Sequence, residues 1–179
     1  MLKEVKQSIK IDKKTYLGKK AWFYILVGHQ NYIYYKALKY SRLYRYYKMN
    51  HKSLFAKLKF VYYSSKKNYM TNHFALELNG ADFGNEFVIY HNNIVINHEA
   101  KFGSNCKLHG NNCIGNNGIT NDCPIIGNNV DIGYGASIIG GITVADNVIV
   151  GANSVVNKSI EEASVVVAGT PAKIIRRLK

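Results

Sequence analysis

His91 is the side chain in this sequence best placed for acid–base chemistry. It lies in residues 87–96, where the aliphatic residues Ile89 and Ile96 are seven positions apart in a chain that otherwise repeats every six. An irregular turn of this kind can project a corner histidine into a cleft, and imidazole takes up and releases a proton near neutral pH. A lone histidine in a turn is more commonly an ordinary surface residue, so a catalytic role for His91 depends on the pattern of the residues around it.

The three cysteines, Cys106, Cys113 and Cys123, do not indicate covalent catalysis. A nucleophilic thiol needs a nearby base and a lowered pKa, and nothing in the sequence requires one here. Cys106 fills the small-residue position of a repeat, so packing explains it. Three cysteines are also too few, and odd in number, for a disulfide framework. Reduced thiols in a cytoplasmic protein are the simpler interpretation.

A six-residue repeat predicts the element that positions these residues. Six consecutive positions of this frame are aliphatic and β-branched, namely Ile126, Ile132, Ile138, Val144, Val150 and Val156. The frame runs back to Ile96 and fails only at Thr120, in a polar stretch that we expect to bulge out as a loop. Glycine or asparagine is expected at the corners, where φ is positive. Three units make a triangular coil of about eighteen residues, and stacked coils bury an aliphatic column.

An ordinary antiparallel sheet is the competing interpretation of the repeat. Such a sheet alternates with a period of two and has irregular loop spacing. The strict period of six therefore favours a mainly β fold, a parallel β-helix, preceded by a different architecture. Residues 1–75 contain 17 Lys and Arg against 2 Asp and Glu, whereas residues 76–179 contain 7 against 9. We expect a basic, Tyr-rich α-helical segment at 1–75, the β-helix at 76–167 and a closing segment at 168–179.

The N-terminal segment is predicted to form helices over residues 20–49 and 53–65, with Ser53 as an N-cap. Its interleaved aromatic and basic residues fit a helical layer covering the open end of the β-helix. They also fit peripheral contact with an anionic membrane surface, at the inner face of the membrane. Nucleic-acid binding has no supporting motif and is not expected. The longest apolar run, residues 21–27, is far shorter than the roughly 20 residues that span a bilayer, so we expect a cytoplasmic protein.

The stretch from Ile126 to Lys173, IGNNVDIGYGASIIGGITVADNVIVGANSVVNKSI…AGTPAK, resembles the hexapeptide-repeat acyltransferases. Within them it is similar to the serine acetyltransferase branch, especially its short relatives from polysaccharide and capsule gene sets. The resemblance is close over residues 75–179 and loose before them. It implies a left-handed β-helix, a homotrimer with active sites between subunits, acetyl-CoA as co-substrate and no metal. It also implies direct transfer of the acetyl group to a hydroxyl.

The resemblance assigns roles residue by residue. It makes His91 the general base and places an orienting acid near Glu77, with Asp82 as second choice. His109, eighteen residues after His91, would line the acceptor site or replace it as base. The coenzyme groove would use small residues and C-terminal cations, namely Gly133, Gly135, Ala136, Gly141, Ala152, Lys173 and Arg176.

Departures from the serine acetyltransferase pattern bear on the acceptor. The family carries Asp before the catalytic histidine, where this chain has Tyr90, and Arg-His before a proline, where this chain has Asp122-Cys123. These changes remove charges that suit a zwitterion. A hydroxyl of a sugar or polysaccharide precursor, including a lipid-linked saccharide, is therefore the expected acceptor. The alternatives are a serine O-acetyltransferase of cysteine biosynthesis, an inactive β-helical scaffold, and a lipid- or nucleic-acid-binding module driven by residues 1–75.

Overall fold

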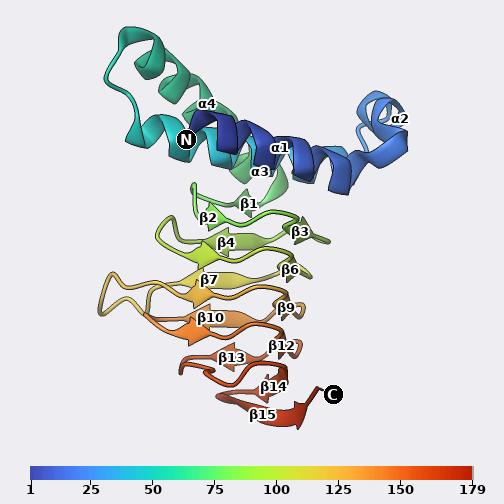
Figure 1. Cartoon of the computed structure of the whole chain (residues 1–179), viewed down its shortest axis with the longest axis vertical. Helices are drawn as coiled ribbons and strands as arrows, with labels where there is room; N and C mark the ends of the chain where they lie inside the picture. The colour runs from blue at the N-terminus through green and yellow to red at the C-terminus, as the bar shows by residue number, and fades with distance from the viewer. Residues whose placement is uncertain (179) are drawn as a thin grey trace.

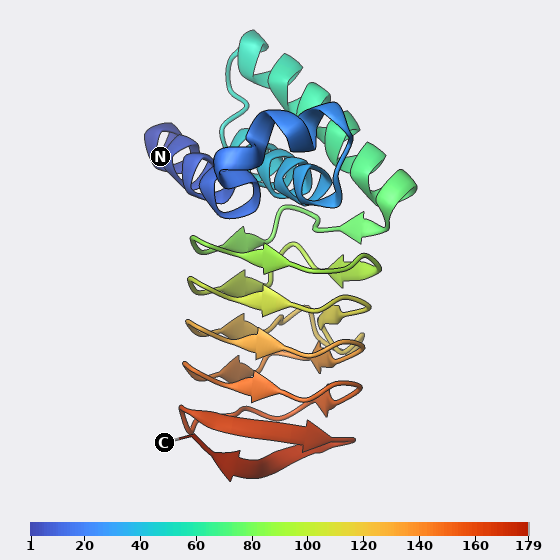
Figure 2. The same ribbon diagram turned by 90° about the vertical axis from the view of Figure 1, so that its right-hand side faces the viewer.

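A layer of helices covers one end of a stack of short strands in this computed structural model, which describes residues 1–178 (Figures 1 and 2). The helical elements of the described residues are α1 (Leu2–Leu17), a 3-10 turn (Gly18–Lys20), α2 (Ala21–Leu26), α3 (Gln30–Met49) and α4 (Leu54–Phe74). None of the helices within residues 1–178 is long and apolar enough to span a bilayer.

The helix boundaries differ from those expected. Ser53 is the N-cap of α4, as predicted, and its hydroxyl oxygen accepts a hydrogen bond from the Ala56 amide at 3.2 Å. The helix expected over residues 20–49 is broken at Gly28, where φ is +62°. α1 was not predicted, because its lysine-rich sequence buries few residues. α4 continues to Phe74, beyond the predicted end at residue 65, because the polar stretch at residues 64–68 remains helical.

The strands form three sheets that wind around one core, and their strands are parallel except for the last one. The five-stranded sheet contains β1 (Leu76–Glu77), β4 (Ile94–Ile96), β7 (Cys113–Gly115), β10 (Ser137–Ile139) and β13 (Val155–Val156). The four-stranded sheet contains β2 (Asp82–Phe83), β5 (Lys101–Phe102), β8 (Ile125–Ile126) and β11 (Thr143–Val144). The six-stranded sheet contains β3 (Val88–Ile89), β6 (Lys107–Leu108), β9 (Asp131–Ile132), β12 (Ile149–Val150), β14 (Val165–Gly169) and β15 (Ala172–Arg177). The predicted aliphatic column is buried along the axis.

Asparagine rather than glycine supplies most of the corners with positive φ. Asn105, Asn129 and Asn147 have φ of 56°, 55° and 58°. Their side chains are also linked from coil to coil, because the Asn105 amide donates to Asn129 Oδ1 and the Asn129 amide donates to Asn147 Oδ1, each at 2.9 Å. The glycines that follow the aliphatic residues serve close packing instead. A Cβ on Gly133 would lie 2.7 Å from the Ala152 nitrogen of the next coil.

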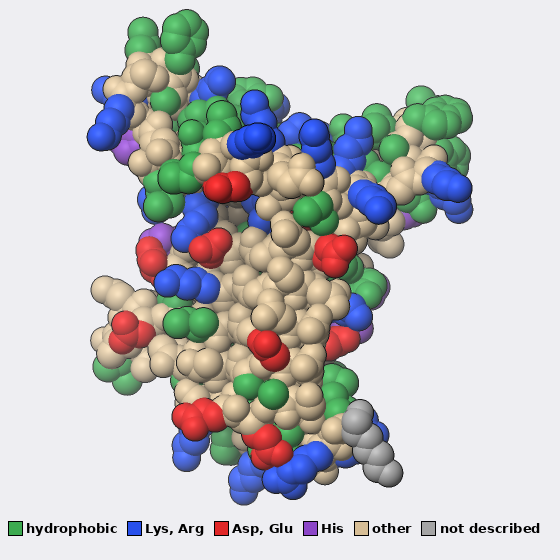
Figure 3. All heavy atoms as spheres, in the orientation of Figure 1, with side chains coloured by type: hydrophobic (Ala, Val, Ile, Leu, Met, Phe, Trp, Pro, Cys, Tyr) green, Lys and Arg blue, Asp and Glu red, His purple; other side chains and the backbone are tan. Residues whose placement is uncertain are grey.

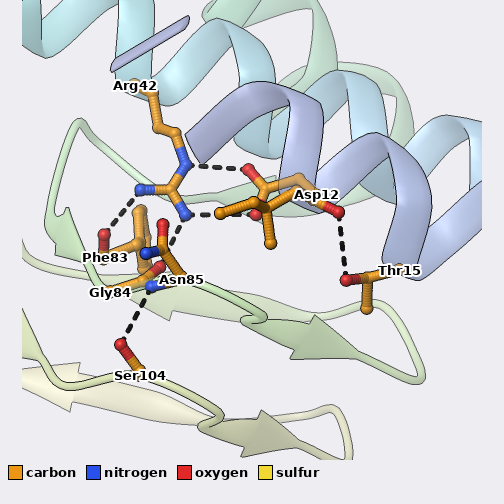
Figure 4. Close-up of polar contacts among 8 residues, drawn as sticks. Asp12, Thr15, Arg42, Phe83, Gly84, Asn85 and Ser104 are labelled. Carbon is orange, nitrogen blue, oxygen red and sulfur yellow. Dashed lines mark hydrogen bonds and ion pairs between the residues drawn. The ribbon is translucent and has the colours of Figure 1, made fainter. Parts of the chain in front are cut away.

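A buried ion pair fixes the helical layer to the first coil (Figure 4). Arg42 on α3 donates through Nε to Asp12 Oδ2 of α1 at 2.8 Å, and its Nη2 donates to Gly84 O at 2.6 Å. Nη1 donates to Phe83 O at 2.5 Å. Burial raises the pKa of Asp12, and attraction to the Arg42 guanidinium opposes that rise. One guanidinium therefore joins two helices to the backbone of the β-helix.

The last coil ends in a hairpin. β15 pairs with β14 antiparallel, whereas the other paired strands within residues 1–178 are parallel. Lys173 and Arg176 lie on β15 and are exposed, and Arg177 Nε donates to Glu162 Oε1 at 2.6 Å. The residues expected to close the chain thus form the outermost strand of the stack.

Candidate active site

The two histidines lie in turns at the same edge of the β-helix, where the six-stranded sheet passes into the five-stranded sheet. We call this edge, formed by residues 90–93, 109–112, 133–136 and 151–154, the histidine edge. Residues 90–93 are exposed, and His91 stands at the corner as the irregular spacing predicts. Its ring faces the edge of the Tyr134 ring, with centroids 6.4 Å apart and an interplanar angle of 75°.

The extra residue in the first turn shifts the stacking by one position. Because Ile89 pairs with Leu108 in the sheet, Tyr90 rather than His91 lies above His109. The Tyr90 and His109 rings are 4.9 Å apart between centroids. Tyr90 is also tied to the helical layer, since the Tyr34 hydroxyl donates to its carbonyl at 3.2 Å. The two imidazoles therefore share an edge but are not stacked on each other.

Asp131 is the carboxylate that the structure places beside an imidazole. His109 Nε2 lies 2.7 Å from Asp131 Oδ1, and both side chains are partly exposed. A carboxylate in this position can accept a hydrogen bond from the ring and so hold one tautomer and one ring orientation. Asp131 was not among the site residues expected from the sequence. The loop after β7 lengthens this coil to 24 residues, from Lys107 to its partner Asp131, so the spacing from His109 to Asp131 does not match the repeat.

Asn112 holds the corner behind the two histidines. Its buried side chain accepts from the Gly110 amide through Oδ1 at 2.9 Å and donates through Nδ2 to Gly133 O at 2.8 Å and Ala136 O at 3.1 Å. Three backbone groups from two successive coils are thus satisfied by one amide. This network fixes the backbone on which His109 and the turn of His91 rest.

The expected pairing of Glu77 with His91 is not formed within the chain. Glu77 lies on β1 and accepts from Asn79 Nδ2 at 2.9 Å. Asp82, the second choice, lies on β2 with its carboxylate 3.4 Å from Arg45 Nη2. Across residues 1–178 no hydrogen bond or ion pair links either acid to His91. The outward side of β1 directs Glu77 onto the five-stranded sheet, which explains the separation.

The residues expected to form the coenzyme groove lie in three places. Gly133, Gly135, Ala136 and Ala152 belong to the histidine edge, where Ala136 is fully buried and its side chain is not accessible to a ligand. Gly141 lies at another edge, between the five-stranded and four-stranded sheets. A Cβ added at Gly141 would lie 2.5 Å from Asp122 Cβ. Lys173 and Arg176 lie on the C-terminal hairpin.

The edge at Gly141 carries a hollow of about 730 Å³. The loop formed by residues 116–124 overhangs it, as the interruption at Thr120 predicts. Its lining is mostly polar and comprises Asn97, His98, Glu99, Lys101, Asn116, Asn121, Asp122, Cys123, Ile125, Gly141, Ile142 and Thr143. The position at which the chain departs from the family pattern, Asp122-Cys123, therefore borders a cavity.

Two of the cysteines, Cys106 and Cys123, have surroundings that favour the protonated thiol. Burial raises the pKa of Cys106 to about 11. Burial also raises the pKa of Cys123, and the nearby Glu99 carboxylate adds to the rise. A thiol with a raised pKa is a poor nucleophile near neutral pH. In the described part of the chain, no three His, Cys, Asp or Glu side chains gather as metal ligands would.

Comparison with known proteins gives partial matches to serine acetyltransferases. No protein-family model matches the chain. The serine acetyltransferase of Buchnera aphidicola is 43% identical over 94 residues, which cover 52% of this chain and 32% of that protein. That of Staphylococcus xylosus is 37% identical over 101 residues, covering 55% and 46%. The chain thus spans about a third to a half of the length of these curated relatives.

The fold is shared with solved structures over nearly the whole chain. The serine acetyltransferase from Brucella abortus, solved in complex with coenzyme A, has a TM-score of 0.76 with 23% identity, covering 97% of this chain and 68% of that one. The expected left-handed β-helix with N-terminal helices is confirmed by this likeness. The likeness also extends through the helical layer, where the sequence resemblance is loose.

Proposed function

We propose that this protein is an acetyl-CoA-dependent O-acetyltransferase that uses a histidine of the histidine edge as general base. The observation that carries the proposal is the pair of imidazoles at one edge of a β-helix shared with serine acetyltransferases. His91 lies beside Tyr134, and His109 Nε2 lies 2.7 Å from Asp131 Oδ1. The matched relatives are named for acetyl transfer, and one structural neighbour holds coenzyme A. His91 is the base in this proposal, and His109 with Asp131 lines the acceptor position or takes over the proton.

The proposed reaction needs one proton acceptor and no covalent enzyme intermediate. The acceptor hydroxyl oxygen attacks the thioester carbonyl carbon while the histidine nitrogen takes the hydroxyl proton. The tetrahedral oxyanion then collapses, the bond from carbon to sulfur breaks, and the histidine returns the proton to the leaving coenzyme A thiolate. Lys173 and Arg176 would hold the coenzyme's phosphates through charge-assisted hydrogen bonds.

We further propose that the complete site forms between subunits of a homotrimer. In a single chain, the histidine edge and the hollow at Gly141 lie on different edges of a triangular prism. A cyclic trimer uses two different surfaces of each subunit at every contact. Such a contact can bring the histidine edge of one subunit against the hollow of the next, which would unite the residues that one chain keeps apart.

Serine is the acceptor best supported by the matched relatives, since those reported are named for it. A saccharide hydroxyl is the second candidate. It is supported by the Tyr90 ring beside His109 and by Asp122 and Cys123 in the lining of the hollow. At these positions the family carries charges that suit a zwitterion, and this chain does not carry them.

The test is an assay of coenzyme A release from acetyl-CoA with L-serine and, separately, with a panel of soluble saccharides. Turnover with either acceptor that His91→Asn abolishes supports the proposal. Absence of turnover with every acceptor, together with failure to bind coenzyme A by calorimetry, would overturn it. The acceptor that gives the higher kcat/KM decides between serine and sugar.

A further inference from the structure

The outer side of α4 carries an apolar stripe that nothing in the described chain covers. Phe55, Leu58, Tyr62 and Tyr69 recur three, four and seven positions apart, so they share one side of the helix. Their exposed fractions are 78%, 60%, 51% and 47%. The inner side packs on α3, as in the stacking of Tyr63 on Tyr47 at 5.6 Å between centroids. A helix that is apolar on both sides has a second surface to bury.

α2 presents a second apolar surface at the other end of the helical layer. None of its residues is buried, and Trp22 and Leu26 are 70% and 71% exposed. Lys19 and Lys20 precede it and are exposed. In Figure 3, hydrophobic side chains gather at both tips of the helical layer, away from the β-helix, with Lys and Arg between them. We use the name outer helical face for the surface formed by α2, the outer side of α4 and the Lys and Arg side chains that lie between them.

The charge of this face limits what can cover it. Residues 1–75 contain 17 basic and 2 acidic side chains. Asp12, one of the two acids, is buried against Arg42, and Glu4, the other, pairs with the N-terminal amine at 2.8 Å. A second copy of this chain would bring two strongly basic surfaces together, which like-charge repulsion opposes. An anionic surface is instead complementary to it.

We propose that the outer helical face docks on an anionic phospholipid surface. The aromatic and aliphatic side chains of α2 and α4 enter the boundary between headgroups and acyl chains, and the lysines contact lipid phosphates. Contact is peripheral, since no helix of residues 1–178 can span a bilayer. The proposal is independent of the acetyl-transfer proposal, because it concerns residues outside the histidine edge and the hollow.

Trp22 is the single tryptophan of the chain and therefore reports on this face directly. Vesicles of phosphatidylglycerol and phosphatidylcholine in equal parts are expected to shift its emission to the blue and to co-sediment with the protein. Vesicles of phosphatidylcholine alone are expected to do neither. Salt above the physiological range is expected to weaken the sedimentation, since lysine attraction to lipid is screened.

Substitutions of apolar residues separate the apolar contribution to vesicle binding from that of the basic side chains. Phe55→Ser with Leu58→Ser is expected to lower the partition onto the anionic vesicles by about tenfold or more, because the inserted apolar area is lost. Ile119→Ser, at an 88% exposed position in the loop of the β-helix, is the matched control and should bind as the parent does. All these positions are exposed, so the variants should fold, which circular dichroism verifies.

Two results would overturn the proposal. One is an unchanged Trp22 emission with anionic vesicles. The other is a concentration-dependent assembly, seen by sedimentation velocity, that the Phe55→Ser and Leu58→Ser variant dissociates without any loss of vesicle binding. That second result would assign the stripe to a contact between copies. Acetyl transfer to a soluble acceptor, measured in the same variant, should remain at the parent level, so failure of either proposal is recognised separately.

Discussion

Gly110 lies directly beneath His91 at the histidine edge. A Cβ on Gly110 would come 2.5 Å from His91 Cβ, and the φ of Gly110 is +105°. The absence of a side chain at residue 110 is therefore what allows the His91 turn to rest on the next coil. This contact connects the packing of the β-helix with the position of the candidate base.

Gly110→Ala is expected to displace His91 and to lower kcat with a small loss of stability. The matched control is Gly118→Ala, since Gly118 also has positive φ, +75°, but a Cβ there meets nothing within 4 Å. In both variants an alanine at positive φ introduces backbone strain of about 1–2 kcal/mol. Only Gly110→Ala adds a clash between the new Cβ and His91 Cβ. Steady-state kinetics and urea unfolding measure the two effects. Equal kcat values in the two variants would show that the clash does not reach the reaction.

His91→Asn is expected to lower kcat by about 100- to 10,000-fold, the usual contribution of a general base. Asp131→Asn should act through His109, so its effect shows whether His91 or His109 is the general base. If His91 is the base, Asp131→Asn changes KM more than kcat. A large fall in kcat for Asp131→Asn and His109→Asn, with His91→Asn near the parent, would transfer the role to His109. The pH profile of kcat/KM checks each variant.

Mixed trimers test the placement of the site between subunits. His91→Asn removes the base, and Thr143→Trp fills the hollow, so each variant alone is expected to be inactive. Random mixing by co-expression should restore about a quarter of the parent activity, because one contact in four combines two intact surfaces. Light scattering checks that the mixture is trimeric. No recovery in a confirmed mixed trimer would place the whole site within one chain.

Arg42→Met is expected to lower the free energy of unfolding by about 3–5 kcal/mol, since it leaves the Asp12 carboxyl buried without its partner. Without the guanidinium, the pKa of Asp12 should rise further above its ordinary 3.8. A carboxyl with a raised pKa in the folded state stabilises the fold at low pH and loses that contribution as pH rises through the folded pKa. The free energy of unfolding of the variant should therefore be lower at neutral pH than at acidic pH. Urea unfolding at a series of pH values measures it. Adding Asp12→Asn should remove the extra pH dependence, and a slope that survives this change would contradict the assignment.

Acetyl-CoA without an acceptor should leave the protein unacetylated. The raised pKa values of Cys106 and Cys123 keep their thiols protonated near neutral pH. Intact-mass measurement after rapid mixing with acetyl-CoA checks this. One acetyl group found on Cys123 at a rate that matches turnover would require an acyl-enzyme and would refute direct transfer.

The repeat made the β-helix predictable, because a period of six specifies inward residues and corners without any knowledge of long-range contacts. The loop at Thr120 followed from its interruption, and the corner position of His91 from the extra residue between Ile89 and Ile96. Asp131 was not predictable, since the same loop changes the length of the coil that brings it to His109. α1 escaped notice because it buries only Asp12, Tyr16 and Leu17 among many exposed lysines, which leaves no long apolar stripe in its sequence. The separation of Glu77 from His91 depends on which side of β1 faces outward.

Because β15 runs antiparallel to β14, it determines which backbone groups lie exposed at the end of the stack. A parallel stack that ended in β14 would present the backbone of Val165, Val166 and Val167 as a template onto which another chain could add strands. β15 occupies that place, and its exposed Lys173 and Arg176 put positive charges on the new outer strand. Like charges meeting end to end repel one another, so these residues oppose the pairing of one stack with the end of another.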